Sequence, residues 1–296
     1  MPISTEMIFA SAERYATVNK IALDKVYKKL NKEGKLPPLK ESQITTQYKA
    51  EDIAYKVLQI MLDDGITTYQ ELEEQHHQAQ KAYFLCPINI VVLNSLIITA
   101  LNDNDTQRWL AKGIKLAESI FDDAYEAENK GHYWGLNATR PYIRMLETKF
   151  NCLVENGKKK EAITIAERII YLNESDNLGV RDDLQLMYLK EKMYEEYIVL
   201  IDKYPNDYSV GFYFNYALYL YLIEGPNHPD TTAAMEEAIA FNPFVLDYIT
   251  KKKNPIKLTS KYYNPQKVEG AILYYETSKH LWLTVFGVQK WLAKFV

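Results

Sequence analysis

The feature that most constrains the fold is a helical period of apolar residues that recurs along almost the whole chain. Two neighbouring stretches each place four such residues on one helical face: Tyr142, Leu146, Phe150 and Leu153 in PYIRMLETKFNCLV, and Ala162, Ala166, Ile169 and Ile170 in KKEAITIAERIIYL. Gly157 lies between the two stretches and can adopt the left-handed conformation that ends a helix. Together they predict an antiparallel helical hairpin.

Similar hairpins follow at 182–204 and 209–241. Their second helices resemble one another, and the spacing from Glu161 to Glu196 is 35 residues while that from Glu196 to Glu237 is 41. These spacings lie near the period of about 34 residues that is typical of tetratricopeptide repeats. The sequence therefore predicts an all-α fold, an α-solenoid of degenerate tetratricopeptide-like hairpins in which neighbours bury a continuous core.

The two ends of the chain depart from this pattern. Residues 1–49 contain one helical stretch, 12–30, and a connector marked by Pro37 and Pro38, so we expect a cap or a loosely attached arm. Residues 50–296 are expected to form a single repeat domain. Its last part, 267–296, is predicted to supply capping helices after a loop with two Asn-Pro breaks.

Composition excludes several classes of protein. The 35 basic and 39 acidic residues give a net charge of −4, which argues against a nucleic-acid partner because phosphate contacts need a concentrated basic face. The longest apolar run, 88–101, is too short to span a membrane. No secretory signal is recognisable at the N-terminus, so the cytoplasm is the expected location. Export by a specialised secretion system stays open.

Sequence motifs for catalysis or metal binding are absent. The chain has no GxxxxGK[ST], GxSxG or HExxH pattern, and its five histidines and two cysteines do not have metal-ligand spacing. We therefore expect no cofactor and no metal.

The stretch GHYWGLNATRPYIR, 131–144, is the densest group of functional side chains. Thr139 and Pro141 suit the start of a helix. That role does not account for Arg140 and Arg144, which are four residues apart and share a helical face. Two interpretations remain open for the arginines. One is an internal ion pair with an acidic residue, for which the candidates are Asp122, Asp123 and Asp176. The other is a clamp for a carboxylate or phosphate, with His132 and Trp134 beside it.

The chain also contains 24 tyrosines, several of them in DYSVGFYFNYALYLYLI, 207–223. Aromatic side chains surround this predicted helix, including Tyr213 and Tyr216. A helix that is apolar all round is usually buried on most sides, so core packing is the favoured interpretation. An aromatic recognition groove is the alternative.

Four segments, GHYWGLNATRPYIR, GKKKEAI, LNESDNLGVR and NPFVLDYI, together resemble a known family. They are similar to bacterial tetratricopeptide-like proteins related to the suppressor-of-tumorigenicity-seven family of animals, over about 130–296. The sequence departs from that pattern at Ala138, where the family tends to have Glu. The resemblance implies an all-helical repeat fold and no enzymatic activity. The positions that match the family motifs are His132, Trp134, Gly135, Thr139, Arg140, Pro141, Arg144, Asp176, Asn177, Gly179 and Arg181.

The sequence thus predicts a non-catalytic helical-repeat protein that binds a protein or peptide of unknown identity. Its candidate binding residues are the arginine and aromatic side chains above together with two positions of the second motif block: His132, Trp134, Arg140, Arg144, Asn177, Arg181, Tyr213 and Tyr216. The alternative is an enzyme or small-anion-binding protein that uses His132 with Arg140 and Arg144. A third interpretation gives these residues a structural role and places the function in the N-terminal half.

Overall fold

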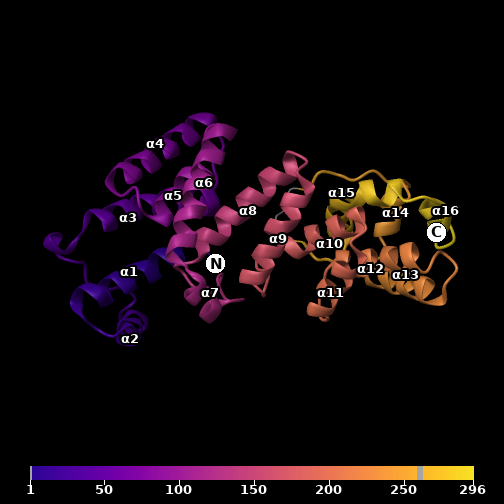
Figure 1. The fold of residues 1–296 in the computed structure, drawn as a ribbon, viewed down its shortest axis with the longest axis horizontal. Helices are drawn as coiled ribbons and strands as arrows, with labels where there is room; N and C mark the ends of the chain where they lie inside the picture. Colours follow the sequence, from indigo (N-terminus) through magenta and orange to yellow (C-terminus); the bar gives the residue numbers. More distant parts are fainter. Residues whose placement is uncertain (1, 259–262) are drawn as a thin grey trace. The chain divides into compact units, whose positions relative to one another are not determined.

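The computed structural model describes residues 2–258 and 263–296, and within them the fold is all-helical, as the sequence predicts (Figure 1). The chain divides into two compact units, Met1–Asn177 and Leu178–Val296. The sequence instead predicts a boundary near residue 49. The residues of the predicted arm therefore belong to the first unit, and each unit is described by itself below.

The first unit consists of helical hairpins. Helices α3 and α4, α5 and α6, and α8 and α9 pack in pairs, while α3 also contacts α5, and α5 contacts α8. Figure 1 shows α3, α4 and α5 side by side. The helices are α1 (Ile3–Asn19), α2 (Leu23–Glu33), α3 (Thr46–Gln59), α4 (Tyr69–Leu85), α5 (Ile90–Ile98), α6 (Asp103–Ile120), α7 (Asp123–Asn129), α8 (Arg140–Glu155) and α9 (Lys159–Leu172), with a short 3₁₀-helix η1 (Glu41–Gln43) and a short π-helix η2 (Ile60–Asp64).

Local chemistry sets where these helices begin and end. Thr68 and Glu71 form a reciprocal capping box at the start of α4. Asn89 accepts hydrogen bonds from two amides in the first turn of α5, those of Val91 and Val92. After α8, Gly157 has a φ of 68°, the left-handed conformation that the sequence predicts. These helix boundaries are therefore specified by residues close to them in the sequence.

The first helix is part of the core of its unit. The sequence predicts one helical stretch over 12–30, but the structure breaks it at Lys20, whose left-handed φ of 55° ends α1. Ile3 and Ala10 of α1 belong to a buried cluster that also contains Leu58 of α3 and Val92 of α5. Because α1 buries these side chains, it is packed into the unit.

The second unit is built around α12 and α15. Helix α10 pairs with α11, α12 with α13, and α15 contacts α10, α12 and α14. Asn215 of α12 lies at the centre of a buried hydrogen-bond network: it donates to Gln185 and accepts from Tyr274, which accepts from Trp282. The helices are α10 (Val180–Glu191), α11 (Tyr194–Lys203), α12 (Val210–Ile223), α13 (Pro229–Phe241), α14 (Val245–Ile249), α15 (Val268–Thr284) and α16 (Val288–Leu292). Part of the predicted loop before α15, residues 259–262, lies outside the described residues.

Among the helices of the described ranges, none combines the length and the apolar character needed to cross a membrane.

Candidate functional site

Arg140 and Arg144, the two arginines of the 131–144 stretch, both contact the carboxylate of Glu6 on α1. Arg140 Nη1 lies 3.4 Å from Glu6 Oε1, and Arg144 donates to both oxygens, with 3.1 Å between Nη1 and Oε2. Glu6 is fully buried, and both arginine side chains are 8% exposed. We call this group the Glu6 clasp. It joins residues that are 134 and 138 positions apart in the chain.

The Glu6 clasp has further support from the turn before α8. Arg140 Nε donates to the carbonyl oxygen of Trp134, and the Trp134 ring lies 5.8 Å from the Arg140 guanidinium and 5.5 Å from that of Arg144. Thr139 occupies the N-cap position before α8, but its hydroxyl donates to the Tyr133 carbonyl oxygen and does not cap the helix. Buried charges of this kind are stable only when paired and hydrogen-bonded. The geometry is that of an internal ion pair, and its acidic member is Glu6, not one of the aspartates that the sequence suggested.

The other candidate residues are spread over both units. The His132 side chain is exposed and has no hydrogen bond or ion pair among the described residues, while its backbone bridges to Asn173. Asn177 is exposed at the end of the first unit. Arg181 belongs to the second unit, where its Nε donates to Asp207 at 2.8 Å. The structure does not bring the His132 side chain to an arginine within the described residues, and a binding role for each of these residues stays a prediction.

The tyrosine-rich helix α12 is packed on most sides. Tyr213 stacks on Phe241 with a centroid separation of 4.2 Å, and Tyr216 stacks on Tyr219 at 6.1 Å. Phe214 is fully buried, whereas the side chain of Tyr216 is 37% exposed. The helix therefore contributes mainly to the core, and Tyr216 marks its accessible edge.

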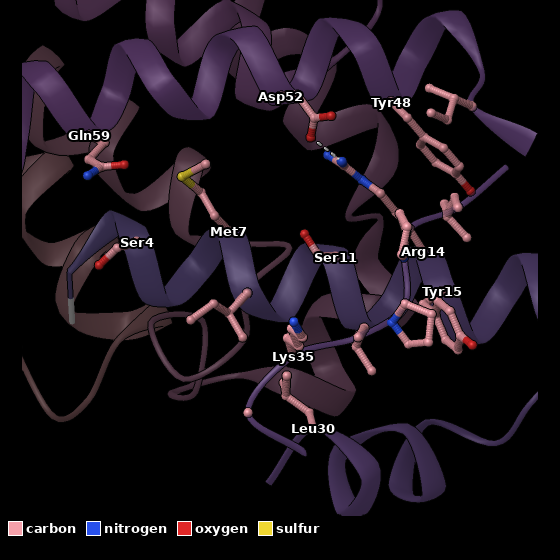
Figure 2. Close-up of a pocket in the computed structure, with 17 residues that line it drawn as sticks. Ser4, Met7, Ser11, Arg14, Tyr15, Leu30, Lys35, Tyr48, Asp52 and Gln59 are labelled. Carbon is pink, nitrogen blue, oxygen red and sulfur yellow. Dashed lines mark hydrogen bonds and ion pairs between the residues drawn. The ribbon is translucent and has the colours of Figure 1, made fainter. Parts of the chain in front are cut away.

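A cavity of about 680 Å³ lies between α1, α2, the 34–39 connector and α3. We call it the connector cavity. Figure 2 shows Met7, Ser11 and Arg14 directed from α1 toward α3, with Asp52 and Tyr48 opposite. Most of the lining is apolar, and its apolar members include Met7, Ile8, Leu30, Leu36, Pro37 and Leu39. Ligand sites are typically of this size and character, about 300–1,000 Å³ and largely apolar with a few polar groups.

A second cavity, of about 390 Å³, lies on the other side of α1. It is bounded by α1, α3, the turn from α4 to α5, the end of α6 and the 137–138 turn, and we call it the Glu13 cavity. Glu13, Glu51 and Asn137 line it together with the exposed Ile88 and Ile120.

Arg14 lies in the wall that the two cavities share. One guanidinium nitrogen donates to Asp52 in the connector cavity and the other to Glu51 in the Glu13 cavity, the latter at 2.8 Å. The ring of Tyr48 lies 5.2 Å from the same guanidinium. Arg14 therefore fastens α1 to α3 between the two hollows.

Sequence reasoning did not single out Glu6, Glu13, Arg14 or either cavity. The helical i, i+3, i+4 spacing relates two sets of residues on α1: 6, 10, 13 and 17, and 4, 7, 8, 11 and 15. The two stripes of α1 were therefore visible in the sequence. What each stripe faces was not visible in that pattern. In the described part of the chain, no group of three or more His, Cys, Asp or Glu side chains is arranged to hold a metal ion.

No family model, no curated protein and no solved structure matches the chain.

Proposed function

We propose that this chain is a non-catalytic helical-repeat protein that binds a segment of another protein, and that the binding surface lies on the two sides of α1 in the first unit. The observation that carries the proposal is the connector cavity, about 680 Å³ and mostly apolar, with Arg14 and Asp52 as its polar anchor.

The packing of the hairpins supports a repeat protein. The first helix of one pair contacts the first helix of the next pair: α3 contacts α5, and α5 contacts α8. The second helix of one pair also contacts the first helix of the next pair: α4 contacts α5, and α6 contacts α8. Stacked helical hairpins of degenerate tetratricopeptide type have this order. Such arrays form extended surfaces that act by binding. The resemblance of about 130–296 to bacterial tetratricopeptide-like proteins, which is an expectation from the sequence motifs, favours the same conclusion.

The Glu6 clasp argues for recognition at the cavities and against recognition at the arginines. Glu6 already occupies the position that a partner's carboxylate would take between Arg140 and Arg144. An external anion would have to displace a fully buried glutamate, which is costly. We therefore assign the arginine pair a structural role and the cavities the binding role.

A selection from a displayed peptide library against the full-length chain tests this function. Peptides that are enriched should bind in calorimetry, and Ile8→Arg should weaken that binding at least about tenfold because a charged side chain would occupy the apolar cavity. Ile8 is 49% exposed, so the substitution should leave the fold intact.

Val154→Arg is the matched control. Val154 is 47% exposed on α8 and lines neither cavity, so its substitution should leave the affinity unchanged. A library that yields no binder, or binders indifferent to Ile8→Arg, would contradict the proposed function.

A further inference from the structure

The second helices of the first two hairpins, α4 and α6, lie side by side and share an exposed face. The ring of Tyr83 on α4 packs edge-to-face on Trp109 of α6, with 5.0 Å between the ring centroids. Lys112 of α6 lies 4.5 Å from the centroid of the Tyr83 ring and donates to its hydroxyl. Further along, Ile88 after α4 and Ile120 at the end of α6 line the same cavity. The two helices therefore run in the same direction.

The α4 side of this face is apolar. Phe84 is 83% exposed, Leu85 is 40% exposed, and Ile88 in the following turn is 74% exposed. A single exposed apolar side chain is ordinary, but three of them between positions 84 and 88 form a patch. Apolar patches rimmed by polar residues mark sites of interaction with another molecule.

Three exposed lysines flank the apolar patch: Lys81 on α4, and Lys112 and Lys115 on α6. Lys112 and Lys115 are three residues apart and share a helical face. Within the described part of the chain, Lys81 and Lys115 form no ion pair, and Lys112 donates to a neutral hydroxyl. No acidic residue occurs in 76–88 or in 106–117. The positive charge of these lysines is therefore not compensated along the two helix segments.

The acidic residues that border these two segments do not neutralise the lysines. Glu74 lies seven residues, about two helical turns, before Lys81. Asp105 is paired with an arginine of its own helix at 2.8 Å. Glu118 accepts a hydrogen bond at 3.5 Å from the hydroxyl of Tyr142 on α8. The surface thus combines uncompensated positive charge with exposed apolar side chains.

We propose that this surface binds an acidic segment of a partner protein, in which Asp or Glu residues flank one or two bulky apolar residues. We call it the α4/α6 face and define it by Lys81, Phe84, Leu85, Lys112 and Lys115. The apolar side chains of the segment contact Phe84 and Leu85, and its carboxylates pair with the lysines. The five residues line neither cavity beside α1, so the site is distinct from the proposed binding surface there.

Charge favours a protein segment over a nucleic acid or a membrane. Binding to nucleic acid depends on many phosphate contacts, whereas this chain has a net charge of −4 and the α4/α6 face has three lysines. Basic clusters that bind anionic membranes typically contain about 4–8 lysines or arginines. A short acidic segment needs only a few cations, and the apolar patch supplies the rest of the contact.

The test is fluorescence anisotropy, with the full-length chain titrated into fluorescein-Gly-Asp-Glu-Phe-Leu-Asp-Glu-Gly-amide at low ionic strength, where exposed charges are least screened. An analogue with Asn and Gln in place of Asp and Glu keeps the shape without the charge. We expect saturable binding of the acidic peptide. The dissociation constant should be at least about tenfold higher for the analogue and for Lys81→Glu/Lys115→Glu. Phe84→Ser should raise it at least about fivefold because apolar contact is lost.

Lys279→Glu/Lys290→Glu is the matched control. These lysines are exposed on α15 and α16 of the second unit, and their substitution changes the net charge by the same amount. It should leave the affinity unchanged, and so should Ile8→Arg, which blocks the connector cavity. All substituted side chains are exposed, so the variants should keep the circular dichroism spectrum of the wild type.

Four results would overturn the inference: no saturable binding of the acidic peptide, equal binding of the two peptides, an affinity that Lys81→Glu/Lys115→Glu leaves unchanged, or an equal loss in the control double variant. Vesicles containing phosphatidylserine provide a further comparison. If the chain binds such vesicles through Lys81 and Lys115 but does not bind the peptide, the assignment to a protein segment is wrong. Because Ile8→Arg affects only the connector cavity, failure here leaves the proposed function standing.

Discussion

Helix α1 carries two glutamates on one face, and the groups that surround their carboxylates differ. Glu6 is fully buried and accepts hydrogen bonds from Arg140 and Arg144. Glu13, two turns further on, lines a cavity, and its carboxylate has no ion pair within 2–258 and 263–296. The residue type and the helical stripe are the same, so the difference comes from what the rest of the unit places opposite each position. One helix face can thus attach α1 to its unit at one position and face a cavity at another.

The largest effect is expected from removing the two arginines of the Glu6 clasp. Arg140→Ala/Arg144→Ala leaves the Glu6 carboxylate buried without a partner, which typically costs about 3–5 kcal/mol of unfolding free energy. Hydrogen-exchange mass spectrometry should also show loss of protection in α1, because the clasp joins that helix to α8. Urea denaturation followed by circular dichroism gives the size of the effect.

A matched control for this prediction is Arg108→Ala. Arg108 forms an exposed ion pair with Asp105 in the same unit, and 64% of the Arg108 side chain is accessible. Its substitution should therefore lower the unfolding free energy by less than about 1 kcal/mol. If the double variant unfolds with the same free energy as wild type, the clasp does not hold α1, and Glu6 and Glu13 do not differ in the way described.

The hairpins could be derived from the sequence because their causes are local. The apolar period, Gly157 and Pro141 in the first turn of α8 all act within a few residues, and the structure places them as expected. The break in the first helical stretch was missed because nothing in the apolar pattern distinguishes Lys20 as a left-handed position.

The site could be derived only in part. The i, i+4 spacing of Arg140 and Arg144 predicted an anionic partner for both arginines, and an internal ion pair was one of the two interpretations. The partner, Glu6, could not be found because it lies 134 residues before Arg140, and only tertiary packing brings the two together. The cavities were missed for the same reason, since elements from α1 to the 137–138 turn contribute to one of them.

A smaller effect is expected in the pH dependence of stability. Because the folded state raises the pKa of Glu13, the folded chain binds the Glu13 proton more tightly than the unfolded chain does. Stability from this group therefore falls as pH rises from the ordinary pKa of 4.5 through the raised one. Glu13→Gln removes this contribution, so its melting temperature relative to wild type should increase across that interval. A difference that is constant with pH, or that changes in the other direction, would contradict the assigned surroundings of Glu13.

The difference between the closed clasp and the open cavity is tested most directly by the unfolding free energies of Glu6→Gln and Glu13→Gln, measured side by side in urea at neutral pH. Both substitutions remove one charge from the same face of α1. We predict that Glu6→Gln loses about 3–5 kcal/mol, because two buried guanidinium groups lose their counter-charge. Glu13→Gln should stay within about 0.5 kcal/mol of wild type. Equal losses for the two variants would contradict the distinction between a closed clasp and an open site.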